Sequence, residues 1–385
     1  MEVRQIYEIL NTTTKEVLGK EDLVLEDLSN IVDVGKELFT ATSVDNYVKS
    51  LVDHIGKVVF VNRVYGGSAP SILMDGWEFG SVLEKIQCDT PDATENETWE
   101  LENGKSYDEN VFYKPSVSVK FYNDRVTFEV PISITDKQVK SAFSSATQLN
   151  SFMSMILNAV ERSLTVKIDS LVRKTIVNFI GETLKTDEVT SETASTKSTA
   201  RCVNLLKLYN DETGSKLTKA KALTDIGFLR YASKVMGMYT DRLKTLSSLF
   251  NIGGKDRFTD SDLLHCVLLS DFEKSVKSTL MSDTYHEEYV ALPTHETIAF
   301  WQGSGVDYKY SSTSKINIKT SSGSTIEMDG IIGVMFDRDA LGVANMDRYV
   351  TSKYNAKAEF TNFWYKYFAG YFNDFNENFV VFFIA

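Results

Sequence analysis

The spacing of apolar residues between Thr147 and Gly181 predicts one long helix. Apolar side chains recur there every three or four positions, and no proline interrupts the pattern. The stripe consists of Leu149, Met153, Ile156, Leu157, Val160, Leu164, Ile168, Leu171, Val172, Ile176, Phe179 and Ile180. A helix of about 35 residues is roughly 50 Å long, so we expect neighbouring elements to cover this stripe along its whole length.

The segment before this helix changes from helical to strand periodicity. "VRQIYEIL" (3–10) and "NYVKSLVDHIG" (46–56) have helical spacing, whereas "KVVFVNRVY" (57–65) is typical of a strand. In "SVSVKFYNDRVTFEVPISITD" (116–136) apolar and polar residues alternate on either side of "YNDR". Asn103-Gly104 is a hairpin-turn signal. We therefore expect strands that run out to a tip and back.

The region after the long helix mixes both periodicities. "RCVNLLKLYND" (201–211) and "DSDLLHCVLLSDFEKSVKS" (260–278) predict helices. "KINIKTSSGSTIEMDGIIGVMFD" (315–337) predicts strands around its "SSGS" turn.

The C-terminal segment, "EFTNFWYKYFAGYFNDFNENFVVFFIA" (359–385), holds 12 aromatic residues. Its aromatic run fits a helical stripe, but aromatic and β-branched enrichment favours a strand that is apolar on both faces. "NDFNEN" is then a turn and "FVVFFIA" the partner strand. We expect this segment to be the last strand pair of the core sheets.

Composition bounds the class of protein. A chain of 385 residues with 43% apolar content predicts two or three domains. No stretch reaches the roughly 18 apolar residues of a membrane span, and the N-terminus has no signal-peptide core, so we expect a soluble, cytoplasmically made protein. The three scattered cysteines suggest neither a disulfide framework nor a zinc site.

The negative charge is concentrated in one segment. Residues 75–109 hold 11 acidic residues against two lysines, a net charge of −9 out of −12 for the whole chain. This acidic window also contains Trp77 and Trp99, which is unusual for a solvated loop. A chain without a strongly basic face is not expected to bind nucleic acid tightly through phosphates.

The candidate chemical motifs favour structural interpretations. The histidines of "HEEYVALPTHE" (286–296) have a proline between them and do not share a helix face. "NIGGKDR" (251–257) lacks the spacing of a phosphate loop and is predicted to be a turn. Asp337 and Asp339 would share a strand face and could serve acid–base chemistry, but pairing with Arg338 is the favoured interpretation. We expect no catalytic, cofactor or metal site.

The order of these elements resembles the major capsid proteins of tailed bacteriophages with the HK97-like fold. "YVKSLVDHIGKVVFV" (47–61), "ITDKQVKSAFSSATQLNSFMSMILNAV" (134–160) and the closing segment from "GVMFDRDAL" to "FAGYF" (333–372) resemble capsid proteins of phi29-type short-tailed phages. The resemblance implies an α+β fold with an N-terminal arm (1–56), a peripheral domain, an axial α/β domain (185–340) and closing strands (341–385).

In this resemblance the peripheral domain divides further. Its strands and acidic extended hairpin, the E-loop, would occupy 57–134, with the loop at about 66–115. Its long spine helix would occupy 135–184.

The resemblance implies a non-enzymatic major capsid protein. Its copies would form the pentamers and hexamers of an icosahedral or prolate shell around double-stranded DNA, in a virion assembled in the host bacterial cytoplasm. The implied partners are other copies of the chain, a portal protein and, because the arm is short, a separate scaffolding protein. An encapsulin-like compartment and an α/β hydrolytic enzyme are the alternatives.

Charge suggests how neighbouring subunits would meet. We expect the acidic loop to contact basic residues of the next subunit, since complementary charges set register and association rate. The tryptophans would be apolar anchors. The candidate contact residues are Trp77, Glu95, Glu97, Trp99 and Glu100 of the loop and Arg162, Lys167, Arg173 and Lys174 of the spine helix.

Overall fold

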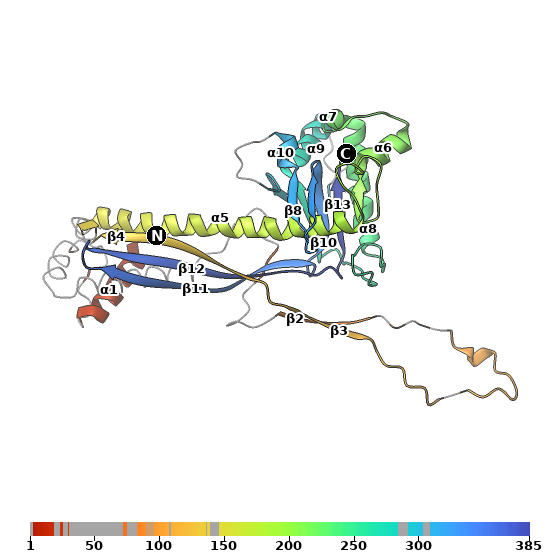
Figure 1. The fold of residues 1–385 in the computed structure, drawn as a ribbon, viewed down its shortest axis with the longest axis horizontal. Coiled ribbons are helices and arrows are strands. Elements are labelled where there is room, and N and C mark those ends of the chain that lie inside the picture. The colour runs from red at the N-terminus through yellow and green to blue at the C-terminus, as the bar shows by residue number, and fades with distance from the viewer. Residues whose placement is uncertain are drawn as a thin grey trace. The chain divides into compact units, whose positions relative to one another are not determined.

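The computed structural model describes residues 3–18, 24–25, 30, 72–74, 83–89, 91, 93, 95–107, 109–135, 137–138, 146–283, 292–302 and 309–385. The predicted segments 46–56 and 57–65 lie outside them, as do Trp77, His54 and His286. The chain divides into two compact units, drawn in Figure 1. Unit 1 comprises Met1–Gly80, Arg125–Val172 and Val343–Gly370, and unit 2 comprises Ser81–Asp124, Arg173–Gly342 and Tyr371–Ala385.

Unit 1 contains a four-stranded sheet with the strand order β1-β11-β12-β4. Its elements are helix α1 (Val3–Leu18) and strands β1 (Leu73–Met74), β4 (Arg125–Thr135), β11 (Leu341–Asn355) and β12 (Phe360–Asn373). β12 and β4 pair antiparallel from Phe360↔Thr135 to Gly370↔Arg125. Along β12, Phe363, Tyr365 and Tyr367 are buried, so alternate aromatic residues form one face of the core.

The predicted long helix is confirmed as α5 (Ala146–Thr186), 41 residues in length. Its first part belongs to unit 1 and runs parallel to the long strands in Figure 1, and its last 14 residues belong to unit 2. The predicted stripe is buried at nine positions: Ile156, Val160, Leu164, Ile168, Leu171, Val172, Ile176, Phe179 and Ile180. Close packing also favours glycine at position 181, because a Cβ added to Gly181 would lie 2.6 Å from Ile318 Cγ2.

Unit 2 contains a five-stranded mixed sheet with the order β5-β13-β10-β6-β7. Its strands are β5 (Cys202–Asn204), β6 (Leu264–Leu269), β7 (Glu296–Ile298), β10 (Ile331–Asp337) and β13 (Phe379–Phe383). Every residue of β10 and of β13 is buried, as expected for central strands that are covered on both faces.

The helices of unit 2 complete its core. They are α6 (Leu205–Thr213), α7 (Lys219–Ala222), α8 (Ile226–Leu243), α9 (Ser270–Asp283) and α10 (Tyr310–Thr313). Asp225 caps α8 by accepting a hydrogen bond from Phe228 N at 2.7 Å, which satisfies a free amide of its first turn. Phe228 and Met236 of α8 are fully buried in one cluster with Phe382 of β13.

Two hairpins accompany this sheet. β8 (Ile316–Lys319) and β9 (Thr325–Met328) flank the predicted "SSGS" turn, where Gly323 has φ +84°. The second hairpin consists of β2 (Leu83–Cys88) and β3 (Val117–Tyr122), which pair antiparallel and lead into a long connecting loop (Figure 1). Together β2 and β3 are called the ribbon below.

Three predictions of secondary structure are wrong in part. The segment "RCVNLLKLYND" contains strand β5 before helix α6 begins at Leu205. The first half of "DSDLLHCVLLSDFEKSVKS" is strand β6, because a short continuous apolar run suits a buried strand as well as a helix. The segment "FVVFFIA" forms a strand, but it does not pair with β12. β13 pairs with β10 and β5, and the predicted turn carries the chain from one sheet to the other.

Candidate functional site: the ribbon and its root

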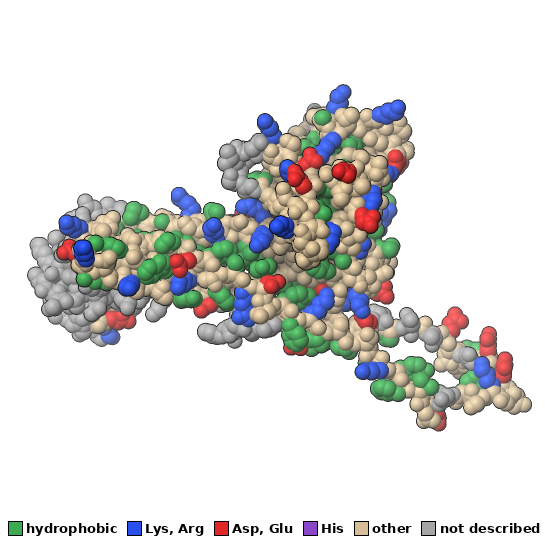
Figure 2. Space-filling model, in the orientation of Figure 1, with side chains coloured by type: hydrophobic (Ala, Val, Ile, Leu, Met, Phe, Trp, Pro, Cys, Tyr) green, Lys and Arg blue, Asp and Glu red, His purple; other side chains and the backbone are tan. Residues whose placement is uncertain are grey.

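The ribbon has its polar and apolar faces reversed relative to an ordinary surface hairpin. Register pairs Lys85 with Lys120 and Gln87 with Ser118, and these four side chains share the more covered face. The opposite face carries Ile86, Val117, Val119 and Phe121, all exposed. Figure 2 shows hydrophobic side chains on the surface of the part of the chain that holds the ribbon. Ile86 is 66% exposed and Phe121 65%. An antiparallel sheet with one solvated face normally turns its apolar side inward.

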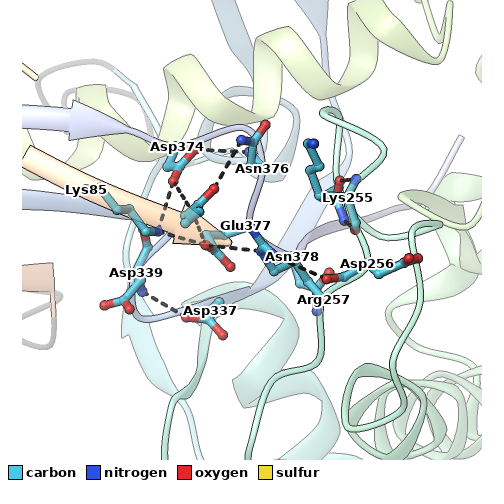
Figure 3. Close-up of polar contacts among 12 residues, drawn as sticks. Lys85, Lys255, Asp256, Arg257, Asp337, Asp339, Asp374, Asn376, Glu377 and Asn378 are labelled. Atoms are coloured by element: carbon cyan, nitrogen blue, oxygen red, sulfur yellow. Dashed lines mark hydrogen bonds and ion pairs between the residues drawn. The ribbon is translucent and has the colours of Figure 1, made fainter. Parts of the chain in front are cut away.

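The polar face of the ribbon meets the turn Asp374–Asn378. Lys85 Nζ lies 2.9 Å from Asp374 Oδ2 and 2.8 Å from Glu377 Oε1 (Figure 3). Lys120 Nζ lies 2.8 Å from Asp374 Oδ1. Gln87 Nε2 donates to Glu377 Oε1 at 2.7 Å, and Gln87 Oε1 accepts from Asn376 Nδ2 at 3.3 Å. We call these contacts the root network.

The root network changes the acidity of its members. Burial alone would raise the pKa of Asp374, whose side chain has no exposed surface, but hydrogen bonds from Lys120 and Lys85 outweigh it and the pKa is lowered. Burial alone would lower the pKa of Lys85, yet its bonds to Glu377 and Asp374 raise it. Both groups are therefore held in their charged forms.

The loop of "NIGGKDR" supports the turn from the other side and is confirmed as a turn itself. Asn251 Oδ1 accepts from Lys255 N at 2.8 Å, and Asn251 Nδ2 donates to Lys255 O. Gly253 N donates to Phe375 O at 2.8 Å. A Cβ on Gly253 would lie 2.0 Å from Asn376 Oδ1 and 3.3 Å from Asn376 Cα, so a larger residue would force Asn376 to move.

A second ion pair joins this loop to the end of β2. Lys255 Nζ lies 2.8 Å from Asp89 Oδ2, and Ser116 Oγ donates to the same carboxylate at 2.8 Å. The bonds from Lys255 and Ser116 lower the pKa of Asp89. Asp89 was counted in the acidic window, but its charge is satisfied within the chain.

The carboxylates considered for acid–base chemistry do not form a pair on one strand face. β10 ends at Asp337, and Asp339 lies in the following turn, so that expectation is wrong. Asp337 accepts from Thr259 Oγ1 at 2.8 Å and from Asp339 N at 2.9 Å, and not from Arg338 as the sequence predicts. Burial raises the pKa of Asp337. This arrangement holds the turn together.

The loop beyond the ribbon presents acidic and aromatic side chains together. Trp99 is 96% exposed, at the end of the short 3-10 helix η3 (Glu97–Trp99), and Phe112 and Tyr113 are each 84% exposed. Glu95 and Glu100 are exposed as well, whereas the side chain of Glu97 lies outside the described residues. The Asn103-Gly104 turn is confirmed, with φ +89° at Gly104.

The basic candidates on α5 differ among themselves. Arg162, Lys167 and Lys174 are exposed. The guanidinium of Arg173 lies over the Phe300 ring, 4.3 Å from its centroid, within unit 2. Arg162 and Lys167 belong to unit 1, whereas Arg173, Lys174 and the described candidate residues of the loop belong to unit 2.

Sequence reasoning missed the root network. Its members lie on segments that are far apart in the sequence. The alternating polar residues Lys85 and Gln87 of "LEKIQC" and Ser118 and Lys120 of "SVSVKF" were the signal that indicates a polar face. Among the described residues there is no cluster of metal-ligating side chains, and no described helix meets the length and hydropathy of a membrane span.

Comparison with known structures places this fold in a class of proteins. The chain is similar to a chain in the capsid structure of Staphylococcus phage Andhra, with 11% identity over 84% of this chain and 86% of that chain and a TM-score of 0.52. A mixed helix-and-sheet fold of the phage-capsid class is thus shared without close sequence similarity. This confirms the predicted class at that coarse level.

The family follows from sequence comparison. The model of the Phi29-like phage major capsid protein family matches residues 10–383, and the chain belongs to this family. It is 25% identical to the major capsid protein of Bacillus phage PZA over 200 residues, and 25% identical to that of Bacillus phage GA-1 over 187 residues. These matches cover 50% and 47% of this chain but only 44% and 38% of those proteins.

The family match confirms the resemblance inferred from the sequence. It favours a phage capsid protein over the encapsulin-like alternative. Because members of this family are structural capsid proteins, the match also supports the expectation that the chain is not an enzyme.

Proposed function

We propose that this chain is a phage major capsid protein that assembles with copies of itself through the ribbon and its loop. Family membership supports the role, and the observation that carries the mechanism is the reversed ribbon. Ile86, Val117, Val119 and Phe121 are exposed on one continuous face. Monomeric proteins rarely expose such contiguous apolar surface, and it marks interaction sites.

Burial of this face would contribute to assembly. Each side chain that passes from water into a packed interface contributes on the order of 1–2 kcal/mol. The exposed rings of Trp99, Phe112 and Tyr113 add three aromatic anchors of the kind that dominate interface energies. A shell multiplies such modest contacts over many copies.

The proposal also assigns the elements of this chain to the parts of an HK97-like capsid subunit. We assign the ribbon and its loop to the E-loop of an HK97-like subunit, α5 to its spine helix and the five-stranded unit to its axial domain. Pentamers and hexamers of such subunits would close an icosahedral or prolate shell around double-stranded DNA. A separate scaffolding protein and a portal protein would take part in assembly in the host bacterial cytoplasm.

Electrostatic attraction between copies remains part of this proposal. Glu95 and Glu100 beside Trp99 form an acidic, aromatic surface, and Arg162, Lys167 and Lys174 are exposed cations on α5. Contact between these surfaces of two copies would set register and speed association, and it would weaken with salt. The acidic chain, with a net charge of −12, is also compatible with packaged DNA that its container does not bind tightly.

Expression of the chain with and without a scaffolding protein, followed by negative-stain microscopy, tests the proposed function. We expect closed shells or capsomers. A monodisperse monomer that does not assemble under either condition contradicts the proposal. Shells that copurify with a protein cargo instead of DNA would support the compartment alternative and contradict the DNA-container role.

A further inference from the structure

The ribbon lacks the usual source of stability of a hairpin, the packing of its apolar face on a core. A two-stranded sheet is marginally stable in water at best, and hairpins usually gain stability by packing their apolar face on a core. This ribbon turns most of its apolar side chains away from its own chain. At one end Tyr122 packs on Phe372, with ring centroids 5.1 Å apart. Lys85, Gln87 and Lys120 contact the rest of unit 2 through the polar bonds of the root network.

The root network is suited to fix the orientation of the ribbon relative to the rest of unit 2. Asp374 receives a lysine from each strand of the ribbon, Lys85 from β2 and Lys120 from β3, on its two oxygens. Attachment through both strands resists rotation of the ribbon, which a single contact would allow. Because charge-assisted hydrogen bonds have demanding geometry, two of them on one carboxylate restrict orientation as well as position.

The anchor that receives these lysines is itself rigid. Asp374 N donates to Ala340 O at 2.6 Å, and Asn376 N donates to Asp374 Oδ1 at 3.1 Å. Gly253 N donates a hydrogen bond to Phe375 O of the turn. Strand β13 begins directly after the turn, and each of its residues is buried. The direction of the ribbon is therefore tied to the central strands of unit 2.

We propose that the root network is a positioning latch. Lys85, Lys120 and Asp374 fix the direction of the ribbon before a second copy arrives, so that its apolar face is preorganised for contact. The cost of ordering the ribbon is then met during folding and not during association. Lys85, Lys120 and Asp374 are positioning residues, and this role rests on the proposed function of the ribbon as an assembly surface.

Hydrogen–deuterium exchange of the soluble subunit tests the latch directly. Lys120→Met keeps the length of the side chain and removes its charge, and Lys120→Arg restores a cation. Lys114→Met is the matched control, since Lys114 lies exposed in the connecting loop just before β3. We expect amides of β2 and β3 to exchange at least about tenfold faster in Lys120→Met, with β6, β10 and β13 unchanged. Lys120→Arg should recover most of the protection.

A double variant tests the same proposal if Lys120→Met alone does not fold. Lys120→Met with Asp374→Asn removes one charge of each sign and leaves less uncompensated charge in the buried turn. The latch predicts faster exchange confined to the ribbon here too. Equal exchange in wild type and either folded variant overturns the proposal. Loss of protection throughout unit 2 also overturns it, because the network would then be a general structural support.

Assembly separates this inference from the proposed function. If the latch is correct, Lys120→Met lowers shell yield while Lys114→Met does not. If wild type forms no shells but the exchange result holds, the proposed function fails and the latch stands as a property of the fold. If wild type assembles and Lys120→Met assembles equally with unchanged exchange, only the latch fails.

Discussion

Two sets of β-branched and aromatic residues in strands of unit 2 have opposite surroundings. β13 holds Phe379, Val380, Val381, Phe382 and Phe383, and all five are buried. The ribbon holds Ile86, Val117, Val119 and Phe121, and all four are exposed. Intrinsic β propensity is similar for both, so the difference comes from their neighbours.

This difference shows which contacts decide which face of a strand is turned toward the protein interior. β13 has strands on both sides and helices over the sheet, so every side chain finds apolar partners. The ribbon has buried carboxylates beneath it instead, and these attract the lysines of its other face. Polar groups thus select the inward face, and the apolar face remains for a partner.

The largest expected effect comes from removing the buried strand. Deletion of Phe379–Ala385 takes away the central partner of β10 and β5, and we expect no soluble subunit. A milder form of the test is Phe382→Ala, which should cost about 3–5 kcal/mol of unfolding free energy, measured by urea denaturation. A soluble, stable deletion variant would show that this segment is a dispensable tail.

The next largest effect concerns the buried carboxylate. Asp374→Ala leaves Lys85 and Lys120 without one shared partner, and we expect a loss of about 3 kcal/mol in a denaturation experiment. Glu84→Ala is the control, because Glu84 lies on the exposed face of β2. A loss no larger than that of the control would mean that the root network contributes little.

Close packing at Gly253 gives a third comparison. Gly253→Ala would force the loop and the Asp374–Asn378 turn apart, and we expect a destabilisation of about 1–3 kcal/mol. Gly254→Asn is the control, because the space around Gly254 is open and asparagine tolerates its φ of +63°. Both variants are compared by thermal unfolding, and similar midpoints would contradict the assigned contact.

The stability of the sheet in unit 2 is expected to depend on pH through His265 of β6. Burial lowers the pKa of His265, so the folded state prefers the neutral ring. The resulting stability is present above the unfolded pKa of about 6.5 and is lost as pH falls through the lower folded value. The slope cannot exceed about 1.4 kcal/mol per pH unit for one proton. His265→Gln should flatten the difference in unfolding free energy between pH 7 and 5; an unchanged pH dependence would contradict this role.

Much of the fold could be predicted from residue periodicity. The stripe of α5 is long enough to be unambiguous, and Asn-Gly and "SSGS" turns have a local physical cause. β6 could not be distinguished from a helix, since it is a short run of six residues of which five are apolar. The pairing of β13 was missed because strand partners depend on long-range contacts that no local pattern encodes.

The candidate site was predicted only in part. The acidic window and Trp99 directed attention to the loop, which does expose aromatic and acidic side chains. The reversed ribbon and the root network needed the register of β2 with β3, which places Lys85 opposite Lys120. Asp374 and Gly253 could not be linked to that register, because they lie about 290 and 170 residues further along than Lys85.

The central claim is that the apolar face of the ribbon serves contact between copies and not the stability of one copy. Phe121→Ser tests it most directly, with the thermal midpoint of the isolated subunit and the yield of shells measured on the same preparation. The account predicts a midpoint within about 2 °C of wild type, since a surface change costs less than about 0.5 kcal/mol, together with a severe loss of shells. A large drop in the midpoint, or shells formed at the wild-type yield, would contradict it.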